Sequence, residues 1–425
     1  MKVLIISHNP MSPVHSIGKT LLSLFSQFKK QELCQIYIHT GYPENDACNS
    51  FYRVTDKDVL KGVFSRRVKG KMVCPVETKD LDHTTALYKH TYGSHKNRQP
   101  HREILRDVMW RISPWYNKVL KLWIEKEKPT CIFAAIGSGT FLYDMAVKIS
   151  KDYHIPLITY VCDDFYSMKA PPGAVGRLWK RGIEKKSKKL FEQSAGVVSI
   201  CNELSDLYRK EFQKPTYTIM TGTNYAVNTS PIIKNDISTL RYFGKLSLNR
   251  YLSLASVCRA IDEINKKRKI QRRVEIYTGC LDEDMKNAFK NIKCARFFGF
   301  ITGEEFQNKF FSSDALIHIE AFDEQSIDRV KNSVSTKIAD SLASGIPLLA
   351  YGPSSVASIS HLIRNNCAMV ATGENELQSK LADFFENTEK RKTIIQNQIN
   401  TAEQYHDPKK VSAFLYEALK KINAE

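Results

Sequence analysis

The chain alternates between two hydrophobic patterns. Short apolar runs, typical of buried parallel strands, are separated by longer segments in which apolar residues recur every third or fourth position, as on one face of a helix. In the first half this pattern predicts strands at 3–7, 35–40, 130–135, 156–162, 196–200 and 216–220. It predicts helices at 17–28, 102–126, 141–152, 176–193 and 202–212. Strands joined by helices of this length form right-handed parallel crossovers, so the first half predicts a Rossmann-like domain.

The pattern restarts after a polar stretch at 222–235, which we interpret as a linker. Strands are predicted at 239–243, 273–278, 295–298, 315–319, 346–350 and 368–371. Helices are predicted at 250–266, 283–289, 303–311, 354–364 and 409–422, with a short helix that opens near Thr336. The segment 41–99 has no clear period, and we interpret it as an elaborated loop region.

The length of 425 residues favours two domains over one. Together with the pattern, it predicts an α/β fold with doubly wound domains at 1–225 and 236–405. Open parallel sheets bind ligands at the carboxyl ends of their strands, so a central cleft between two such domains is the expected site.

The formal net charge of +18 calls for an anionic partner or a solvated basic surface. Much of this charge lies in the segments 66–71, 177–189 and 266–273. Segment 177–189 interleaves apolar residues with cations, so an anionic membrane surface is one candidate partner, and a solvated helix packed on its own domain is the alternative. No zinc-finger spacing, RNA-binding aromatic strand or basic zipper is present, and a nucleic-acid partner is therefore not expected.

The ten cysteines are scattered without a Cys-x-x-Cys pair, which indicates reduced, mostly buried thiols. No run of about 18 apolar residues predicts a membrane span, and the first residues lack the regions of a signal peptide. A cytoplasmic protein, with or without peripheral attachment to the inner face of a membrane, is the resulting expectation.

The segment from residue 335 to 350, STKIADSLASGIPLLA, carries the strongest candidate chemistry. Backbone N–H groups at a helix start, the Thr336 hydroxyl and the Lys337 cation suit a phosphate, and Asp340 could accept hydrogen bonds from a sugar hydroxyl. The alternative is that Thr336 only caps the helix and that Lys337 and Asp340 form a surface ion pair.

This segment resembles the donor-binding helix of GT-B glycosyltransferases, in particular the retaining family four (glycosyl transferases group 1) of the bacterial surface-polysaccharide type. The resemblance extends along nearly the whole chain. It includes Gly18 in the loop after the first strand, the pair Asp163-Asp164 after the strand 156–162, and a Gly-Lys-Leu loop that leads to Arg250. Gly18-Lys19-Thr20 is not a Walker phosphate loop, because the upstream glycine is missing.

The resemblance implies two Rossmann-like domains that face a central cleft, with the helix 409–422 packing back on the first domain. It implies that cations and helix dipoles, and no metal or other cofactor, stabilise a departing nucleoside diphosphate. The expected roles are catalysis by Asp163 and Asp164; diphosphate binding by Lys245, Arg250, Thr336, Lys337 and Gly18; ribose binding by Asp340; base binding by Gly279, Phe298 and Gly299; and donor-sugar binding by Glu320 and Glu324.

Two departures from the family pattern stand out. Asp340 takes the place of the second of two family glutamates, and Asn332 takes the place of the first, eight positions earlier. The sequence therefore predicts transfer of a sugar from a nucleotide sugar to a glycan or lipid-linked acceptor, with retention implied by the resemblance alone. A catalytically inactive homologue that serves as a partner subunit, or a GT-B-fold sugar-nucleotide epimerase, are the alternatives.

Overall fold

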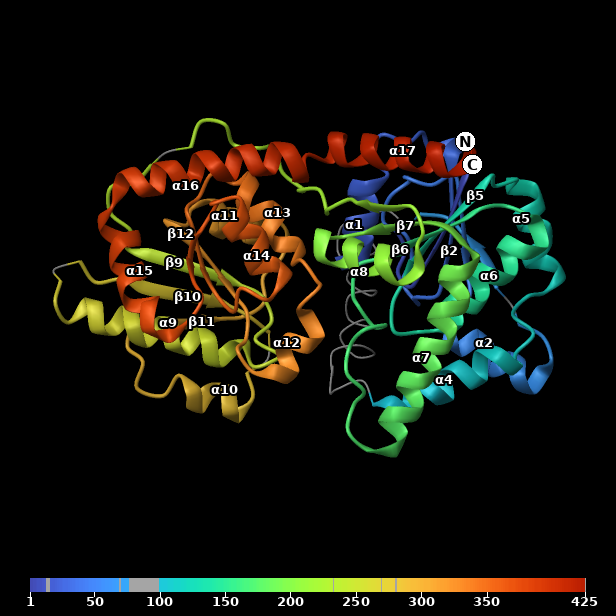
Figure 1. Cartoon of the computed structure of the whole chain (residues 1–425), viewed down its shortest axis with the longest axis horizontal. Coiled ribbons are helices and arrows are strands. Elements are labelled where there is room, and N and C mark those ends of the chain that lie inside the picture. Colours follow the sequence, from blue (N-terminus) through green and yellow to red (C-terminus); the bar gives the residue numbers. More distant parts are fainter. Residues whose placement is uncertain are drawn as a thin grey trace. The chain divides into compact units, whose positions relative to one another are not determined.

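The computed structural model describes residues 1–12, 16–68, 70–75, 99–231, 233–268, 270–279 and 281–424. It divides the chain into two compact units. Unit 1 comprises Met1–Thr221 together with Pro408–Glu425, and unit 2 comprises Gly222–Asp407. Each unit contains one twisted sheet with helices packed on it (Figure 1).

Unit 1 is built on an eight-stranded sheet with the order β4-β3-β2-β1-β5-β6-β7-β8. Its strands are parallel except that β4 runs antiparallel to β3. The strands are β1 Val3–Ser7, β2 Leu33–Tyr37, β3 Ser50–Arg53, β4 Lys71–Val73, β5 Cys131–Ile136, β6 Leu157–Val161, β7 Ser194–Ser199 and β8 Thr216–Thr218. The α-helices are α1 Ser16–Leu24, α2 Asp56–Ser65, α4 Pro100–Ile112, α5 Lys118–Glu127, α6 Phe141–Tyr153, α7 Gly173–Gln193, α8 Asn202–Phe212 and α17 Pro408–Ala424.

The C-terminal helix α17 completes the core of unit 1. It packs against α1 and β7, and its buried residues Val411, Leu415 and Leu419 join a cluster with apolar residues of β1 and α1. Two hydrogen bonds fix this contact, from Ser26 Oγ to the Pro408 carbonyl (2.9 Å) and from the Gln27 amide to Ser412 Oγ (3.0 Å). Residues far apart in the sequence thus form one hydrophobic core.

Unit 2 is built on a fully parallel six-stranded sheet with the order β11-β10-β9-β12-β13-β14. Its strands are β9 Thr239–Phe243, β10 Arg273–Tyr277, β11 Ala295–Phe298, β12 Ala315–Ile319, β13 Leu348–Tyr351 and β14 Met369–Ala371. The α-helices are α9 Arg250–Asn265, α10 Glu283–Ala288, α11 Gly303–Phe311, α12 Glu324–Val330, α13 Thr336–Ala343, α14 Ala357–Arg364, α15 Glu374–Glu386 and α16 Thr388–Thr401. A π-helical turn, η3 Ala402–His406, follows α16.

The two sheets are both of the Rossmann-like type, so the predicted α/β class is confirmed. The central strands β1, β5 and β6 are buried along their whole length, which explains why the sequence shows apolar runs there and not strict alternation. Among the described residues, no helix combines the length and the apolar character that crossing a membrane requires. The cysteines in the same part of the chain are all free, and Cys280 lies outside it.

Several element predictions were wrong. The segment 41–99 is not a single irregular loop, because it contains β3, α2 and β4, while residues 76–98 lie outside the described part of the chain. The single helix predicted at 102–126 is two helices, α4 and α5, because Pro114 cannot continue the first one. Helices α12, α15 and α16 were not predicted.

Candidate functional site

The carboxyl ends of the unit 2 strands bring several predicted residues together. Strand β9 ends at Phe243 and continues into Gly244, and β12 ends at Ile319 and continues into Glu320. The start of α13 reaches the same edge, because Lys337 Nζ lies against Gly244. This is the edge at which open parallel sheets bind ligands.

Gly244 is the residue that makes room for Lys337. A Cβ atom at position 244 would lie 2.1 Å from Lys337 Nζ, and the Gly244 φ of +154° also disfavours other residues. The Gly244 amide donates to the Tyr277 carbonyl (3.0 Å), which fixes the turn. The glycine therefore holds a cation directly against the end of β9.

The Lys337 ammonium has no hydrogen bond or ion pair with any residue that the structure describes. Crowding by protein atoms, and then the nearby charge of Arg250, lower the pKa of Lys337 to about 8, although Glu320 acts in the opposite direction. The residue keeps contact with solvent despite this crowding. A cation that is held without an anionic partner is suited to binding an anion.

Arg250 is held by a buried carboxylate. Its Nε and Nη2 atoms lie 2.9 and 2.8 Å from Glu320 Oε2, and His318 Nε2 lies 3.4 Å from the other carboxylate oxygen. Burial opposes ionisation of Glu320, but the contacts with His318 and Arg250 outweigh it and lower the pKa of the carboxyl. Glu320 was predicted to bind the donor sugar, and the geometry favours a positioning role toward Arg250.

Helix α13 offers a further source of positive potential. Its first turn contains no acidic residue, and the Ser335 side chain does not cap it. The side chains of Thr336 and Lys245 have no hydrogen-bond or ion-pair partner among the described residues. Lys245 also contributes to the lowered pKa of Lys337, which puts their charges close to each other. Fixed positive groups thus converge on one small region.

Three aromatic rings form a ladder across the same edge. Tyr277 stacks on Phe243 on one side (centroids 4.9 Å apart, 14° between planes) and on Phe298 on the other (5.0 Å, 15°). Phe298 is 43% exposed at the open end of this ladder. An aromatic face with one free side can stack on a planar ring.

The predicted glycines Gly279 and Gly299 lie beside this ladder. A Cβ atom at either position would project into open space, so packing does not explain the glycines there. Neither residue has a positive φ. The space that they leave would admit a ligand, and their role in base binding stays a prediction.

Asp340 is engaged within unit 2. Its Oδ1 atom accepts hydrogen bonds from the Asn224 amide (2.9 Å), Thr223 Oγ1 (3.1 Å) and Asn224 Nδ2 (3.2 Å). The carboxylate therefore fixes the start of the 222–235 segment. It does not pair with Lys337, contrary to the alternative that the sequence left open.

The other predicted donor-sugar residue, Glu324, is exposed at the first position of α12. Asp323 precedes it and organises the surroundings. It accepts from the Ser326 amide (2.9 Å) and from Asn249 Nδ2 (3.0 Å), which ties α12 to the start of α9. The structure thus adds Asp323 and Asn249 as residues that position Arg250.

The predicted residues of unit 1 lie in different surroundings. Asp164 follows β6 and accepts from the Ser167 amide (2.9 Å), from Tyr208 OH (3.2 Å) and from Ser167 Oγ, so it fixes a turn. Asp163 beside it is exposed. Gly18 lies in α1, where an added Cβ would come within 2.7 Å of the Pro10 carbonyl oxygen, so packing explains this glycine.

Sequence reasoning missed some contributors to the site. Phe243 and Tyr277, like the predicted Phe298, are each the last residue of a strand, and this shared position could have identified the ladder. His318 and Gly352 offered no such signal. A Cβ at position 352 would lie 2.8 Å from Glu320 Cβ, so Gly352 leaves room for that residue.

A surface cavity of unit 2 lies away from this predicted site. A cavity of about 310 Å³ is lined by residues that include Asp314, Gly345 and Pro347. Asp314 precedes β12 and Pro347 precedes β13, so this cavity lies at the amino ends of the strands, on the opposite edge of the sheet. Its Asp314 carboxylate already accepts from the Ser238 and Thr239 amides.

A search for metal ligands in the described part of the chain found no group of three or more His, Cys, Asp or Glu side chains that could hold an ion.

Similarity to known proteins shows the fold. No protein-family model and no curated protein sequence matches the chain. Among solved structures, the chain is similar to HepE from Anabaena in complex with UDP and glucose, with a TM-score of 0.63 and 12% identity over 99% of this chain and 100% of that one. Its overall architecture is that of the GT-B fold.

Two further structures support this assignment. The chain is similar to sucrose-phosphate synthase from Thermosynechococcus elongatus, with a TM-score of 0.62 and 10% identity over 100% of this chain and 99% of that one. It is also similar to WaaG, a glycosyltransferase involved in lipopolysaccharide biosynthesis, with a TM-score of 0.55 and 11% identity over 97% of this chain and 99% of that one.

Proposed function

We propose that this protein is a glycosyltransferase that moves a sugar from a nucleotide-sugar donor to a glycan or lipid-linked acceptor. The observation that carries this proposal is the Lys337 ammonium, which lies against Gly244 at the start of α13, close to Arg250, and has no partner among the described residues. The structural neighbours support it, since structures of HepE hold UDP or UDP-glucose.

The donor site would work by charge stabilisation. As the bond between the sugar and the diphosphate breaks, negative charge develops on the leaving oxygen. Lys337, Arg250 and Lys245, with the N–H groups of the first turn of α13, would stabilise that charge more strongly than the charge of the intact donor. Because these cations are part of the protein, the proposed reaction needs no metal ion.

The nucleoside would lie along the same edge. Phe298 at the end of the aromatic ladder would stack on the base, with Gly279 and Gly299 leaving room for it. Asp340 would bind the ribose, and Glu324 would contact the donor sugar. The acceptor would be oriented in unit 1 with Asp163 as the candidate base, because Asp164 is engaged in its turn.

Retention of configuration and a role in cell-surface polysaccharide synthesis complete the proposal. Both rest on the family resemblance described above.

An inactive homologue that binds nucleotides as a partner subunit is the second candidate. One observation favours it: the positions of the two family glutamates hold Asn332 and Asp340, and the Asp340 carboxylate is engaged by Thr223 and Asn224. Such a protein would bind a nucleoside diphosphate but would not consume a donor.

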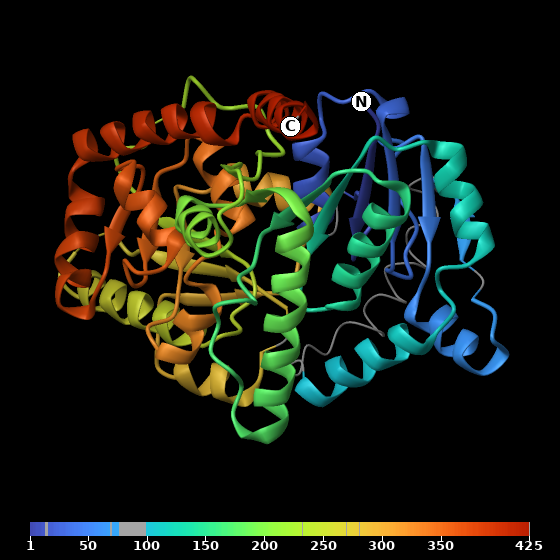
Figure 2. The ribbon, with the colours of Figure 1, turned by 45° about the vertical axis from the view of Figure 1, so that its right-hand side comes forward.

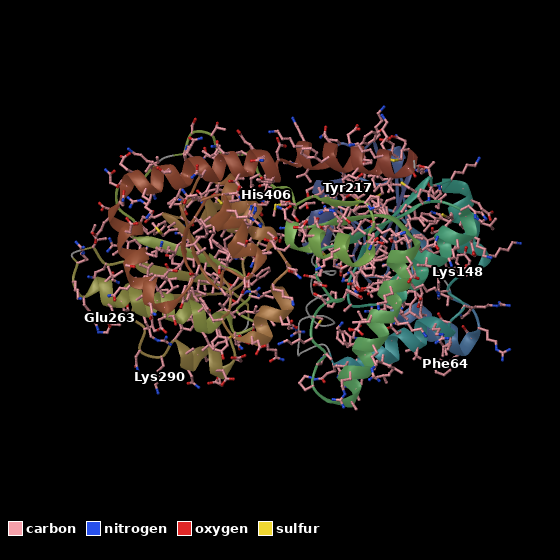
Figure 3. The ribbon with its side chains drawn as sticks, viewed as in Figure 1. Phe64, Lys148, Tyr217, Glu263, Lys290 and His406 are labelled. Atoms are coloured by element: carbon pink, nitrogen blue, oxygen red, sulfur yellow. The ribbon has the colours of Figure 1, made fainter. Side chains whose placement is uncertain are left out.

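Calorimetric titration with UDP, GDP, ADP and CMP tests the donor site. One nucleoside diphosphate should bind, and Lys337→Ala should weaken it by on the order of 100-fold. Lys290→Ala is the matched control, because Lys290 is an exposed lysine elsewhere in unit 2 (Figure 3). If none of the four ligands binds, or if Lys337→Ala binds as tightly as the wild type, the proposed site is wrong.

Measurement of donor turnover distinguishes the transferase, the partner subunit and the epimerase, which share this proposed site. The protein is incubated with the sugar conjugate of the nucleotide that binds, with and without candidate acceptor glycans, and the products are separated by chromatography. Consumption that depends on the acceptor supports transfer. Binding without consumption supports the partner subunit, and a donor epimer formed without acceptor supports the epimerase.

A further inference from the structure

Three helices of unit 1 form a continuous layer. Helix α4 packs against both α2 and α7, and Figure 2 shows α4 beside the lower part of the long helix α7. The inward side of α4 packs against the rest of unit 1. Trp110 stacks on Phe141 (4.3 Å), Arg106 pairs with Asp56 (3.0 Å), and Asp107 accepts from the Phe141 amide (3.0 Å).

The opposite side of α4 is apolar and faces solvent. Leu105, Val108 and Ile112 are 70%, 48% and 62% exposed. Their spacing of three and four residues puts them on one stripe of the helix. Large apolar residues normally occupy the buried side of a surface helix, and here they occupy both sides.

The helices that pack against α4 also expose apolar side chains. Helix α2 exposes Leu60 and Phe64, and α7 exposes Val175 and Leu178 near its start. Phe64 is 83% exposed, and Figure 3 shows it at the periphery of α2. Apolar side chains concentrated on adjacent helices mark an interaction surface more strongly than scattered ones.

The polar residues around these side chains are almost all cationic. The exposed lysines and arginines of the three helices are Lys57, Lys61, Arg102, Arg111, Arg177, Arg181, Lys185, Lys188 and Lys189. Within these helices, which the structure describes in full, Glu192 near the end of α7 is an exposed acidic residue, and the side chains of Asp56 and Glu184, 39% and 44% exposed, pair with Arg106 and Lys180. The surface therefore combines apolar side chains with positive charge that acidic neighbours do not offset.

The acidic residues of these helices take part in internal contacts. Asp56 and Glu103 lie 3.0 and 4.0 Å from Arg106, and Glu184 lies 2.6 Å from Lys180 Nζ. Asp58 accepts from the Thr55 amide (3.0 Å) at the start of α2. The cations on the outward side keep their charge available for an external partner.

We propose that the outward side of α2, α4 and α7 docks on an anionic lipid bilayer. Apolar side chains that enter the boundary between headgroups and acyl chains, flanked by cations that contact lipid phosphates, are the combination that binds such a surface. The charge complementarity selects this partner over a second copy of the chain, whose equally cationic surface would repel the first. The inference concerns binding alone and does not depend on the transfer reaction.

Vesicle sedimentation tests this docking surface. Full-length protein is mixed with vesicles of neutral phosphatidylcholine, with or without about 30% anionic phosphatidylglycerol, at low and at physiological salt. Binding should require the anionic lipid and weaken as salt rises. Equal binding to neutral vesicles, or no binding to either kind, would overturn the proposal.

Two variants assign the binding to this surface. The triple variant Leu105→Ser, Val108→Ser, Ile112→Ser and the double variant Arg177→Glu, Arg181→Glu should each weaken binding by about tenfold or more. The control Val119→Ser, Leu122→Ser changes exposed apolar residues of α5, which are 58% and 54% exposed, and should bind as the wild type does. Circular dichroism verifies that each variant is folded.

A second copy of the chain is the alternative occupant of this surface, and light scattering detects it. If light scattering without lipid shows a dimer that the triple variant converts to a monomer, the surface is a contact between copies and the lipid proposal is wrong. Vesicle binding that is unchanged in both variants would also overturn it. Nucleotide binding, measured separately, should be the same in all of these proteins, so failure of this proposal leaves the donor site untouched.

Discussion

The two Rossmann-like units differ in how they use the carboxyl ends of their strands. In unit 1, two polar groups near this edge have partners within the unit: Asp164 accepts from Ser167 and Tyr208, and Arg106 pairs with Asp56. In unit 2, Lys337 has no partner among the described residues. The same topology can thus hold a self-contained polar network or present fixed charge to a ligand, and the pairing of its side chains decides which.

Gly244→Ala should have the largest effect on the difference between the two units, because it acts on the charge that unit 2 presents. The new Cβ would displace the Lys337 ammonium, so nucleoside diphosphate binding should weaken by on the order of 100-fold, because losing a hydrogen bond to a charged group costs up to about 3 kcal/mol. Calorimetric titration measures it. Gly182→Ala, which adds a methyl group in open space on α7, is the control. Unchanged binding by Gly244→Ala would mean that the position of Lys337 does not matter.

Arg250→Met tests the ion pair between Arg250 and Glu320 at the unit 2 edge. It would leave the buried Glu320 carboxylate without its main partner, and the free energy of unfolding should fall by about 3–5 kcal/mol. Urea denaturation measures the loss. The double variant Arg250→Met, Glu320→Met should recover most of it, and a double variant as unstable as the single one would contradict the assigned pairing.

Asp164→Ala tests the unit 1 side. Tyr208 OH and the Ser167 amide would lose their acceptor, so unfolding should become easier by about 1–3 kcal/mol while nucleotide affinity stays unchanged. Asp163→Asn should reduce turnover, because Asp163 is the proposed base and is exposed. Equal losses of turnover at native stability in both variants would restore the predicted catalytic pair.

A smaller effect is expected when the pH is changed and nucleoside diphosphate binding is measured. The pKa of Lys337 is lowered to about 8, so the cation is present below that value and is lost above it. If the ligand requires the charged form, nucleoside diphosphate affinity should fall about tenfold between pH 7 and pH 9, and this slope should vanish in Lys337→Met. Calorimetry in two buffers should also show proton uptake on binding near pH 8.

The same pKa shift has a consequence for stability. Since the unfolded lysine titrates near 10.5, the native state binds fewer protons between pH 8 and pH 10.5, and Lys337 makes stability rise with pH over this interval. Lys337→Met removes a charge that opposes folding at neutral pH. Its melting temperature should therefore not fall below that of the wild type, in contrast to Arg250→Met.

Chelation should have the smallest effect. If protein cations alone stabilise the diphosphate, EDTA should leave nucleotide affinity and donor turnover unchanged. A loss that Mg²⁺ or Mn²⁺ restores would show that the fixed charges of unit 2 are insufficient.

The sequence alone predicted those elements of this protein that depend on neighbouring residues in the chain. Apolar runs located most strands of both sheets, and a polar helix start followed by Gly345 and Pro347 located α13. Such features depend on neighbouring residues in the chain, and they can therefore be read without a structure. Where local signals were weak, as in 41–99 and 372–407, helices and a strand pair were missed.

Only the tertiary structure decided which polar side chains are buried, which are exposed and which pair with each other. Asp164 and Asp163 are adjacent in the sequence, yet Asp164 is buried and fixes a turn, whereas Asp163 is exposed. Glu320 and Arg250 are 70 positions apart and form a buried pair, whereas Lys337 lies against Gly244 and pairs with no residue in the described part of the chain. The physical reason is that ion pairing and desolvation depend on distances across the fold, which residue types and their spacing along the chain do not determine.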